Sequence, residues 1–166
     1  MATEYWDILD KNGRVTGQRV KREQFNRFRP GQYHLVVHIW IKNSQGEYLI
    51  QKRSENRLPM PGEWAATGGS VLSGEESRTA AMRELGEELG IRVLENEIHY
   101  IARLTRKNSF VDIWSVGVDV NADSLQLQTE EVQAVKWVTK EELEKMIAEK
   151  QFHDYGKAYF EKVFSI

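Results

Sequence analysis

The feature that most constrains this chain is a cluster of four charged residues within six positions. Arg83, Glu84, Glu87 and Glu88 lie in the segment Met-Arg-Glu-Leu-Gly-Glu-Glu-Leu, whose aliphatic spacing predicts an amphipathic helix. At about 100° per residue, the three carboxylates share one side of that helix. Like charges at this spacing destabilise a helix by a few tenths of a kcal/mol per pair, roughly, so a purely structural helix gains nothing from them. Hard oxygen ligands of this kind suit Mg²⁺ or Mn²⁺.

A longer pattern surrounds this cluster. It runs glycine, five residues, glutamate, seven residues, Arg-Glu, an aliphatic residue, one residue, Glu-Glu, one residue, glycine and an aliphatic residue. The positions that match it are Gly69, Glu75, Arg83, Glu84, Leu85, Glu87, Glu88, Gly90 and Ile91. The pattern resembles the Nudix box, here residues 69–91, and a chance match has odds of about one in a billion per starting point. The alternative interpretation is a solvated acidic face of a helix.

The resemblance implies a metal-dependent hydrolase that cleaves the diphosphate of a nucleoside diphosphate linked to another moiety. Glu84, Glu87 and Glu88 would hold Mg²⁺ or Mn²⁺, and the resemblance adds the backbone carbonyl of Gly69 as a ligand. Arg83 would pair with a carboxylate and fix the rotamer of Glu84. Glu75 would lie in the first helical turn, where the helix dipole favours a carboxylate whether or not it touches metal.

The group that activates the attacking water stays open at this stage. In Nudix hydrolases the general base is either a box glutamate, here Glu84, or a glutamate of a later loop. Glu130 and Glu131 occupy such a loop, before the strand that carries Trp137. A solvated turn is the alternative interpretation of these two residues.

Cations and aromatic residues near the expected site are candidate substrate contacts. Three cations are candidates for holding phosphates: Lys52, Arg53 and Arg57. Trp64, Phe110 and Trp114 are candidates for stacking on a base, although aromatic residues in strands usually pack in a core. His34 and His38 face the same side of a strand, and we favour ordinary packing for them over a metal pair.

Interleaved strands and helices predict an α/β fold, an α/β/α sandwich around a mixed sheet. The chain would be one domain, 1–166, with an N-terminal β-hairpin within 1–30. Further strands are expected at 33–42, 48–53, 98–104, 111–120 and 132–138, and helices at 140–150 and 155–164. Between 55 and 67 the prolines forbid a helix.

Local signals predict how the acidic helix begins and ends. Ser73 and Glu76 form a Ser-x-x-Glu capping box at its start, and Gly90 would end it in the left-handed conformation. Gly86 in its middle costs about 1 kcal/mol relative to alanine. We expect that Gly86 allows close packing against a neighbouring strand.

Composition narrows the function classes. The chain has 23 basic and 25 acidic residues, so its overall charge gives no sign of a nucleic-acid partner. It has no cysteine, which excludes disulfides, zinc–thiolate sites and thiol nucleophiles. Neither a signal peptide nor an apolar run long enough to cross a membrane is recognisable. A cytoplasmic protein that acts on a small diphosphate is expected.

Segments outside the box resemble the Nudix branch related to type I isopentenyl-diphosphate isomerase. They include Trp6–Gly13, Tyr33–Trp40, Gln51–Arg53 and Pro61–Trp64. That isomerase needs a catalytic cysteine and a histidine before the box, where this chain reads Thr67-Gly-Gly-Ser-Val71. The resemblance therefore implies retained hydrolase chemistry, with a non-catalytic ligand sensor as the alternative and isomerase activity disfavoured. Family members often dimerise, and the hairpin is a candidate for that contact.

Overall fold

The computed structural model describes residues 2–166, so Met1 of the predicted hairpin region lies outside the described residues. The strands are β1 (Tyr5–Leu9), β2 (Val15–Lys21), β3 (His34–Lys42), β4 (Tyr48–Arg53), β5 (Trp64–Ala65), β6 (Thr67–Ser70), β7 (Ile98–Thr105), β8 (Ser109–Gly117) and β9 (Val132–Val138). The α-helices are α1 (Ser77–Leu89), α2 (Lys140–Ala148) and α3 (Lys157–Val163). Short 3-10 helices are η1 (Arg22–Arg27), η2 (Glu95–Glu97) and η3 (Ala122–Ser124).

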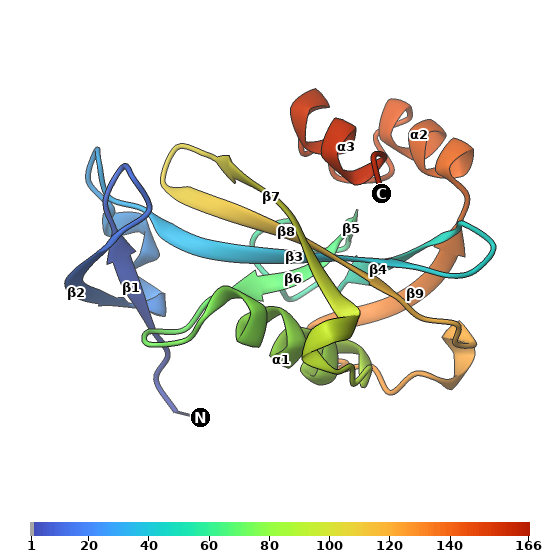
Figure 1. Ribbon diagram of the computed structural model, residues 1–166, viewed down its shortest axis with the longest axis horizontal. Helices are drawn as coiled ribbons and strands as arrows, with labels where there is room; N and C mark the ends of the chain where they lie inside the picture. The colour runs from blue at the N-terminus through green and yellow to red at the C-terminus, as the bar shows by residue number, and fades with distance from the viewer. Residues whose placement is uncertain (1) are drawn as a thin grey trace.

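The main sheet is mixed and is covered by helices on both faces. Its strand order is β5-β4-β3-β8-β7, with β6 paired to β3 and β9 paired to β4. The pairing of β3 with β8 is parallel, whereas β3 pairs with β4 and β6 in the antiparallel sense. Helix α1 covers one face, and α2 and α3 cover the other (Figure 1). The predicted α/β/α sandwich is confirmed.

Each face has its own apolar cluster because successive strand residues point to opposite sides. Beneath α1, Val37, Ile39 and Leu49 pack against Leu85 and Leu89. On the opposite face the buried rings and aliphatic side chains are those of Trp40, Tyr48, Ile50, Leu143, Phe152, Tyr159, Phe160 and Val163. No helix within residues 2–166 is long and apolar enough to cross a membrane.

The N-terminal hairpin is a separate two-stranded sheet of β1 and β2. Leu9 of β1 exchanges backbone hydrogen bonds with Tyr33, next to the start of β3. Asp7 of β1 holds the loop before α1, because its carboxylate accepts from the Ser73 hydroxyl at 2.7 Å and from the Gly74 N–H at 2.9 Å. The hairpin thus fixes the loop that leads into the acidic helix.

The predicted capping box is wrong. Helix α1 begins at Ser77, and its N-cap is Glu76, whose side chain makes no capping hydrogen bond. Ser73 lies too far from the helix start, and its hydroxyl is bonded to Asp7 instead. The segment expected to be a loop up to residue 67 also contains β5 and ends in β6.

The glycines of α1 differ in role. Gly90 ends the helix with φ 68°, and its N–H bonds back to Leu85 and Gly86, as predicted. The expected close packing at Gly86 is wrong, since a Cβ built there would meet only the Arg92 Nη1 atom, at 3.9 Å. Gly86 therefore weakens the helix without a packing reason in the described residues.

Candidate active site

Helix α1 directs its carboxylates to three different environments. Leu85 and Leu89 are buried in the core and fix the rotation of the helix. As a result Glu84 and Glu88 are also buried, with 7% and 0% of their surface exposed. The Glu87 side chain is 52% exposed. The sequence correctly placed the three on adjacent parts of one helix, but burial separates their surroundings.

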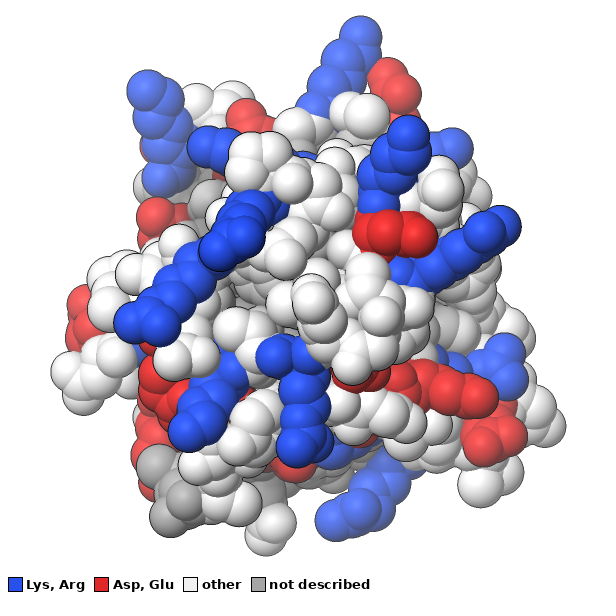
Figure 2. All heavy atoms as spheres, turned by 90° about the vertical axis from the view of Figure 1, so that its left-hand side faces the viewer, with Lys and Arg blue, Asp and Glu red and all other residues white. Residues whose placement is uncertain are grey.

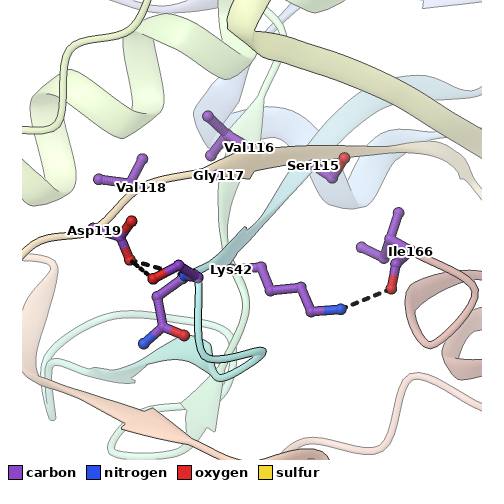
Figure 3. A pocket seen from close by; sticks show the side chains of 9 residues that line it. Lys42, Ser115, Val116, Gly117, Val118, Asp119 and Ile166 are labelled. Atoms are coloured by element: carbon purple, nitrogen blue, oxygen red, sulfur yellow. Dashed lines mark hydrogen bonds between the residues drawn. The ribbon is translucent and has the colours of Figure 1, made fainter.

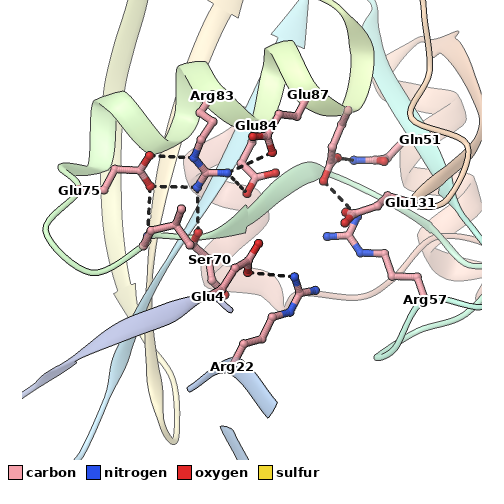
Figure 4. Close-up of polar contacts among 12 residues, drawn as sticks. Glu4, Arg22, Gln51, Arg57, Ser70, Glu75, Arg83, Glu84, Glu87 and Glu131 are labelled. Carbon is pink, nitrogen blue, oxygen red and sulfur yellow. Dashed lines mark hydrogen bonds and ion pairs between the residues drawn. The ribbon is translucent and has the colours of Figure 1, made fainter. Parts of the chain in front are cut away.

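Arg83, in the middle of α1, connects Glu75 before the helix with Glu84 and Glu87 on it (Figure 4). Its Nε and Nη2 atoms donate to the two oxygens of Glu75 at 2.8 and 2.9 Å, a bidentate pair. Its Nη1 atom donates to Glu84 at 3.0 Å and to Glu87 at 3.2 Å, and Nη2 also reaches the Ser70 carbonyl at 3.2 Å. The hydrogen bonds of the Arg83 guanidinium to Glu75, together with the negative charge of Glu84, raise the pKa of Arg83 above its usual range. Arg83 thus contacts Glu84 as predicted, and its positioning role stays a prediction.

Glu84 lies against the backbone of β6. A Cβ built on Gly69 would lie 2.2 Å from the Glu84 Oε1 atom, which is far inside van der Waals contact. Only glycine leaves room for this carboxylate beside the strand. The first glycine of the box is therefore explained by the close approach of Glu84.

A second polar cluster surrounds Glu88, and its members Gln51, Arg57 and Glu131 lie close together in Figure 4. The Gln51 amide of β4 donates to the Glu88 Oε2 atom at 2.7 Å. Arg57, in the loop between β4 and β5, donates to the Glu88 Oε1 atom at 3.0 Å and contacts Glu131 at 2.5 Å. The structure thus brings Arg57, Glu88 and Glu131 together, although they are far apart in the sequence.

Gln51 is a site residue that the sequence reasoning missed. Its side chain is 1% exposed and joins β4 to the end of α1 through Glu88. The available signal was a polar residue in the otherwise apolar strand segment Tyr-Leu-Ile-Gln. A buried polar residue at a core-facing position needs a partner, and here that partner is a glutamate of the box.

The buried carboxylates are held against an electrostatic penalty. Burial raises the pKa of Glu84 to about 8, helped by the charge of Glu88 and opposed by Arg83. Burial also raises the pKa of Glu88, against the attraction of Arg57 and the Gln51 amide. A divalent cation at this position would compensate both charges.

A second observation concerns two polar atoms beside Glu88: an acceptor that fits a cation or its water shell, and a donor that fits a water or a phosphate oxygen. The Gln51 Oε1 and Arg57 Nε atoms are buried and have no hydrogen-bond partner among residues 2–166. Unpaired buried polar atoms are rare in proteins unless a water or an ion satisfies them. Among residues 2–166 no three acidic or histidine side chains converge into a preassembled metal cage, and Arg83 and Arg57 each pair with carboxylates of this row.

The other candidate substrate contacts lie in different places. Arg53 is buried and its Nε donates to the Pro59 carbonyl at 2.9 Å, so it holds the β4–β5 loop. Burial and the nearby charge of Arg57 lower its pKa. Glu130 is exposed on the turn before β9, whereas Glu131 faces Arg57.

Trp64 does not join the carboxylates. It packs against the cluster beneath α2 and α3, and Lys136 lies 4.5 Å above its ring. Helix α1 is on the other face of the sheet, so Trp64 lies apart from the carboxylates, and its role in covering a substrate stays a prediction.

Two further aromatic candidates and the two strand histidines make packing contacts and hydrogen bonds within the fold. Phe110 and Trp114 are buried, and the Trp114 Nε1 donates to Ser77 at 2.9 Å. His38 contacts the Tyr159 hydroxyl at 2.6 Å, and His34 stacks on Trp6 with ring centroids 4.4 Å apart. These contacts agree with packing rather than with a histidine metal pair.

A shallow pocket of about 440 Å³ lies at a distinct place in the fold (Figure 3). Its lining includes Lys42, which donates to the Ile166 carbonyl at 2.9 Å, and Asp119, which accepts from Ser44. None of the carboxylates of α1 lines it. The pocket therefore lies apart from the carboxylates of α1.

Comparison with known proteins agrees with the geometry. The NUDIX domain model matches residues 32–160. An uncharacterized Nudix hydrolase of Listeria monocytogenes is 39% identical over 153 residues, 92% of this chain and 89% of that protein. An isopentenyl-diphosphate delta-isomerase of Pectobacterium atrosepticum is 28% identical over 162 residues, 94% of this chain and 89% of that protein. The crystal structure of DR0079 from Deinococcus radiodurans superimposes with a TM-score of 0.78 at 24% identity, covering 91% of this chain and 93% of that one.

Proposed function

This chain belongs to the Nudix family and is related to its isomerase branch, and we propose that it is a Mg²⁺- or Mn²⁺-dependent pyrophosphohydrolase. Its substrate class is a nucleoside diphosphate linked to another moiety. The observation that carries the proposal is the pair of buried carboxylates, Glu84 and Glu88, with raised pKa values beside unpaired buried polar atoms. A purely structural helix gains nothing from this arrangement, because burying carboxylates carries a desolvation penalty even when arginines pair with them.

The box supplies the groups that would hold the cation. Glu84, Glu87 and Glu88 offer carboxylate oxygens, and Gly69, whose Cα lies against the Glu84 side chain, would add its backbone carbonyl. Once bound, a divalent ion neutralises charge on phosphate oxygens and makes bound water a better nucleophile. Arg83 holds Glu84 and Glu87 at hydrogen-bond distance and so limits the rotamers from which they can bind.

Two loops supply the remaining groups. Glu131 is our candidate for the general base, because its carboxylate reaches the Glu88 cluster through Arg57 while Glu130 remains on the exposed turn. In that role it would accept the proton of the attacking water. Arg53 ends β4 and Arg57 lies in the loop that follows. Arg57 would bind a substrate phosphate, and Arg53 keeps the loop in position.

The test compares three single substitutions with one control. Glu88→Gln and Glu87→Gln should each lower kcat by at least about 100-fold, since removal of a charge-stabilising group has effects of that order. Glu131→Gln should lower kcat by about 100-fold or more and change the acidic limb of the pH–rate profile, if it is the base. Glu144→Gln, on the exposed side of α2, is the matched control and should keep the wild-type rate. A Glu88→Gln variant with wild-type turnover would disprove the metal assignment, and a silent Glu131→Gln would leave Glu84 as the base.

A further inference from the structure

The nearly balanced total charge conceals a strong segregation of charge along the chain. Residues 11–29 contain seven Lys or Arg and one Glu, a net charge of +6, whereas the rest has 16 basic against 24 acidic residues, a net charge of −8. All seven basic residues are exposed: Lys11, Arg14, Arg19, Lys21, Arg22, Arg27 and Arg29. They lie on the hairpin, on η1 and just after it, and together we call them the basic surface. Figure 2 shows Lys and Arg side chains spread over this end of the molecule.

Most of this charge is uncompensated. Of the seven, Arg22 alone forms an ion pair among the described residues, with Glu4 at 3.0 Å. Asp7 and Asp10 form no ion pair among the described residues, since Asp7 bonds to the loop before α1 and Asp10 to backbone N–H groups of its own turn, where its charge faces Lys11 and Arg14. Lys107 extends the surface, because the adjoining Asn108 bonds to Gln32 and His34. Clustered unpaired cations repel one another and are stabilised by a polyanion.

Aromatic rings accompany these cations. Residues 21–29 read Lys-Arg-Glu-Gln-Phe-Asn-Arg-Phe-Arg, and Phe25 is 56% exposed although it is a large apolar side chain. Phe28 is partly exposed and stacks on His34 at 5.3 Å and 11°, and His34 stacks on Trp6 at 4.4 Å and 8°. A basic surface that ends in partly exposed rings is the arrangement that binds single strands, through the phosphates and by stacking of bases.

We propose that the basic surface of residues 11–29, together with Lys107, binds a single-stranded nucleic acid. The chain's total charge predicts no such partner, because the acidic remainder masks the +6 of this segment. Two other occupants agree less well with the structure. An acidic face of a second copy would give a head-to-tail contact, which forms open chains unless the rotation happens to close. An anionic membrane would need cations and apolar groups on one plane, whereas these cations come from a hairpin, η1 and the β7–β8 turn.

Fluorescence anisotropy with a labelled 12-nucleotide oligouridine tests this proposal in metal-free buffer, where hydrolysis plays no part. We expect binding at 50 mM salt that weakens about 100-fold at 200 mM, since each ion pair with a single strand contributes roughly −0.7 to the salt slope. Arg14→Glu/Lys21→Glu/Arg27→Glu should weaken binding at least tenfold and reduce the slope by about 2. None of these three side chains forms an ion pair in the described structure. Phe25→Ala should weaken binding about fivefold or more without changing the slope.

The matched control is Lys145→Glu/Lys157→Glu/Lys162→Glu. It makes the same change in net charge at exposed positions of α2 and α3. It should keep wild-type affinity. Equal weakening by both triple variants, no binding at 50 mM salt, or tighter binding to phosphatidylserine vesicles than to the oligonucleotide would overturn the proposal. If Arg14→Glu/Lys21→Glu/Arg27→Glu fails to fold, the salt slope of the wild type and the affinity of Phe25→Ala decide whether the proposal holds. Because oligonucleotide binding is measured without metal, a failure of the proposed hydrolase activity and a failure of nucleic-acid binding by this surface give different results.

Discussion

Replacement of Glu84 by glutamine should change how the metal-free protein responds to pH. The pKa of Glu84 is raised from 4.5 to about 8, mainly by burial. Because this pKa is higher in the folded protein than in the unfolded chain, the protonated carboxyl stabilises the fold. The stability that Glu84 contributes is therefore fully present below pH 4.5 and is lost as the pH rises through about 8. The neutral amide of glutamine has nearly the same shape and removes this loss.

The magnitude follows from the size of the shift. One pKa unit corresponds to about 1.4 kcal/mol, so a shift from 4.5 to about 8 amounts to about 5 kcal/mol in the free energy of unfolding. Glu84 is only 7% exposed, so solvent screens little of this effect. At pH 9 Glu84→Gln should be several kcal/mol more stable than the wild type, and at pH 5 the two should be nearly equal.

Urea unfolding followed by tryptophan fluorescence, in chelator at pH 5, 7 and 9, measures this difference. Glu87→Gln is the matched control, because it changes a neighbouring carboxylate that is 52% exposed, and it should follow the wild type. Parallel stability–pH curves for the wild type and Glu84→Gln would refute the reasoning. In that case the Glu84 carboxylate would be stably ionised in the fold, with Arg83 outweighing burial.

Three other perturbations have defined outcomes. Gly69→Ala would place a Cβ 2.2 Å from the Glu84 carboxylate, and steady-state kinetics should show kcat reduced by about 100-fold, as for a displaced catalytic group. Gly86→Ala meets no close neighbour, so urea unfolding should show a gain of about 1 kcal/mol, and a loss would reveal a hidden packing role. Burial lowers the pKa of His34 to about 4, so the neutral ring is the form that stabilises the fold. The stability that His34 contributes is present above pH 6.5 and is lost as the pH falls toward 4. His34→Phe should flatten the acid limb of the stability curve, which otherwise falls by about 3 kcal/mol, and an unchanged limb would contradict this assignment.

Local patterns predicted what local interactions decide. The position of α1, the end of that helix at Gly90 and the contact between Arg83 and Glu84 follow from spacing within one helix. The strands were also predicted closely, since alternating apolar residues leave few alternatives for a buried sheet. The predicted start of α1 was wrong because Asp7, distant in sequence, accepts the hydrogen bond of the Ser73 hydroxyl.

Contacts between distant segments were beyond the reach of these patterns. Gln51, Arg57 and Glu131 meet Glu88 only because β4, the β4–β5 loop and the turn before β9 lie beside the end of α1. The side of the sheet on which Trp64 lies was equally undetermined, since β5 has only two residues. Dimerisation through the hairpin stays a prediction.

Metal-dependent cleavage of a diphosphate tests the central claim most directly. A panel of nucleotide sugars, ADP-ribose, dinucleoside polyphosphates, deoxynucleotides and their oxidised forms, and isoprenoid and thiamine diphosphates would be incubated with the wild-type protein. Each would be tested with Mg²⁺, with Mn²⁺ and with chelator, and phosphate-containing products would be measured. We predict that a nucleoside diphosphate derivative is cleaved, and that this cleavage requires the metal. Cleavage that persists in chelator, or a folded protein that binds metal and cleaves none of the panel, would contradict the proposed function.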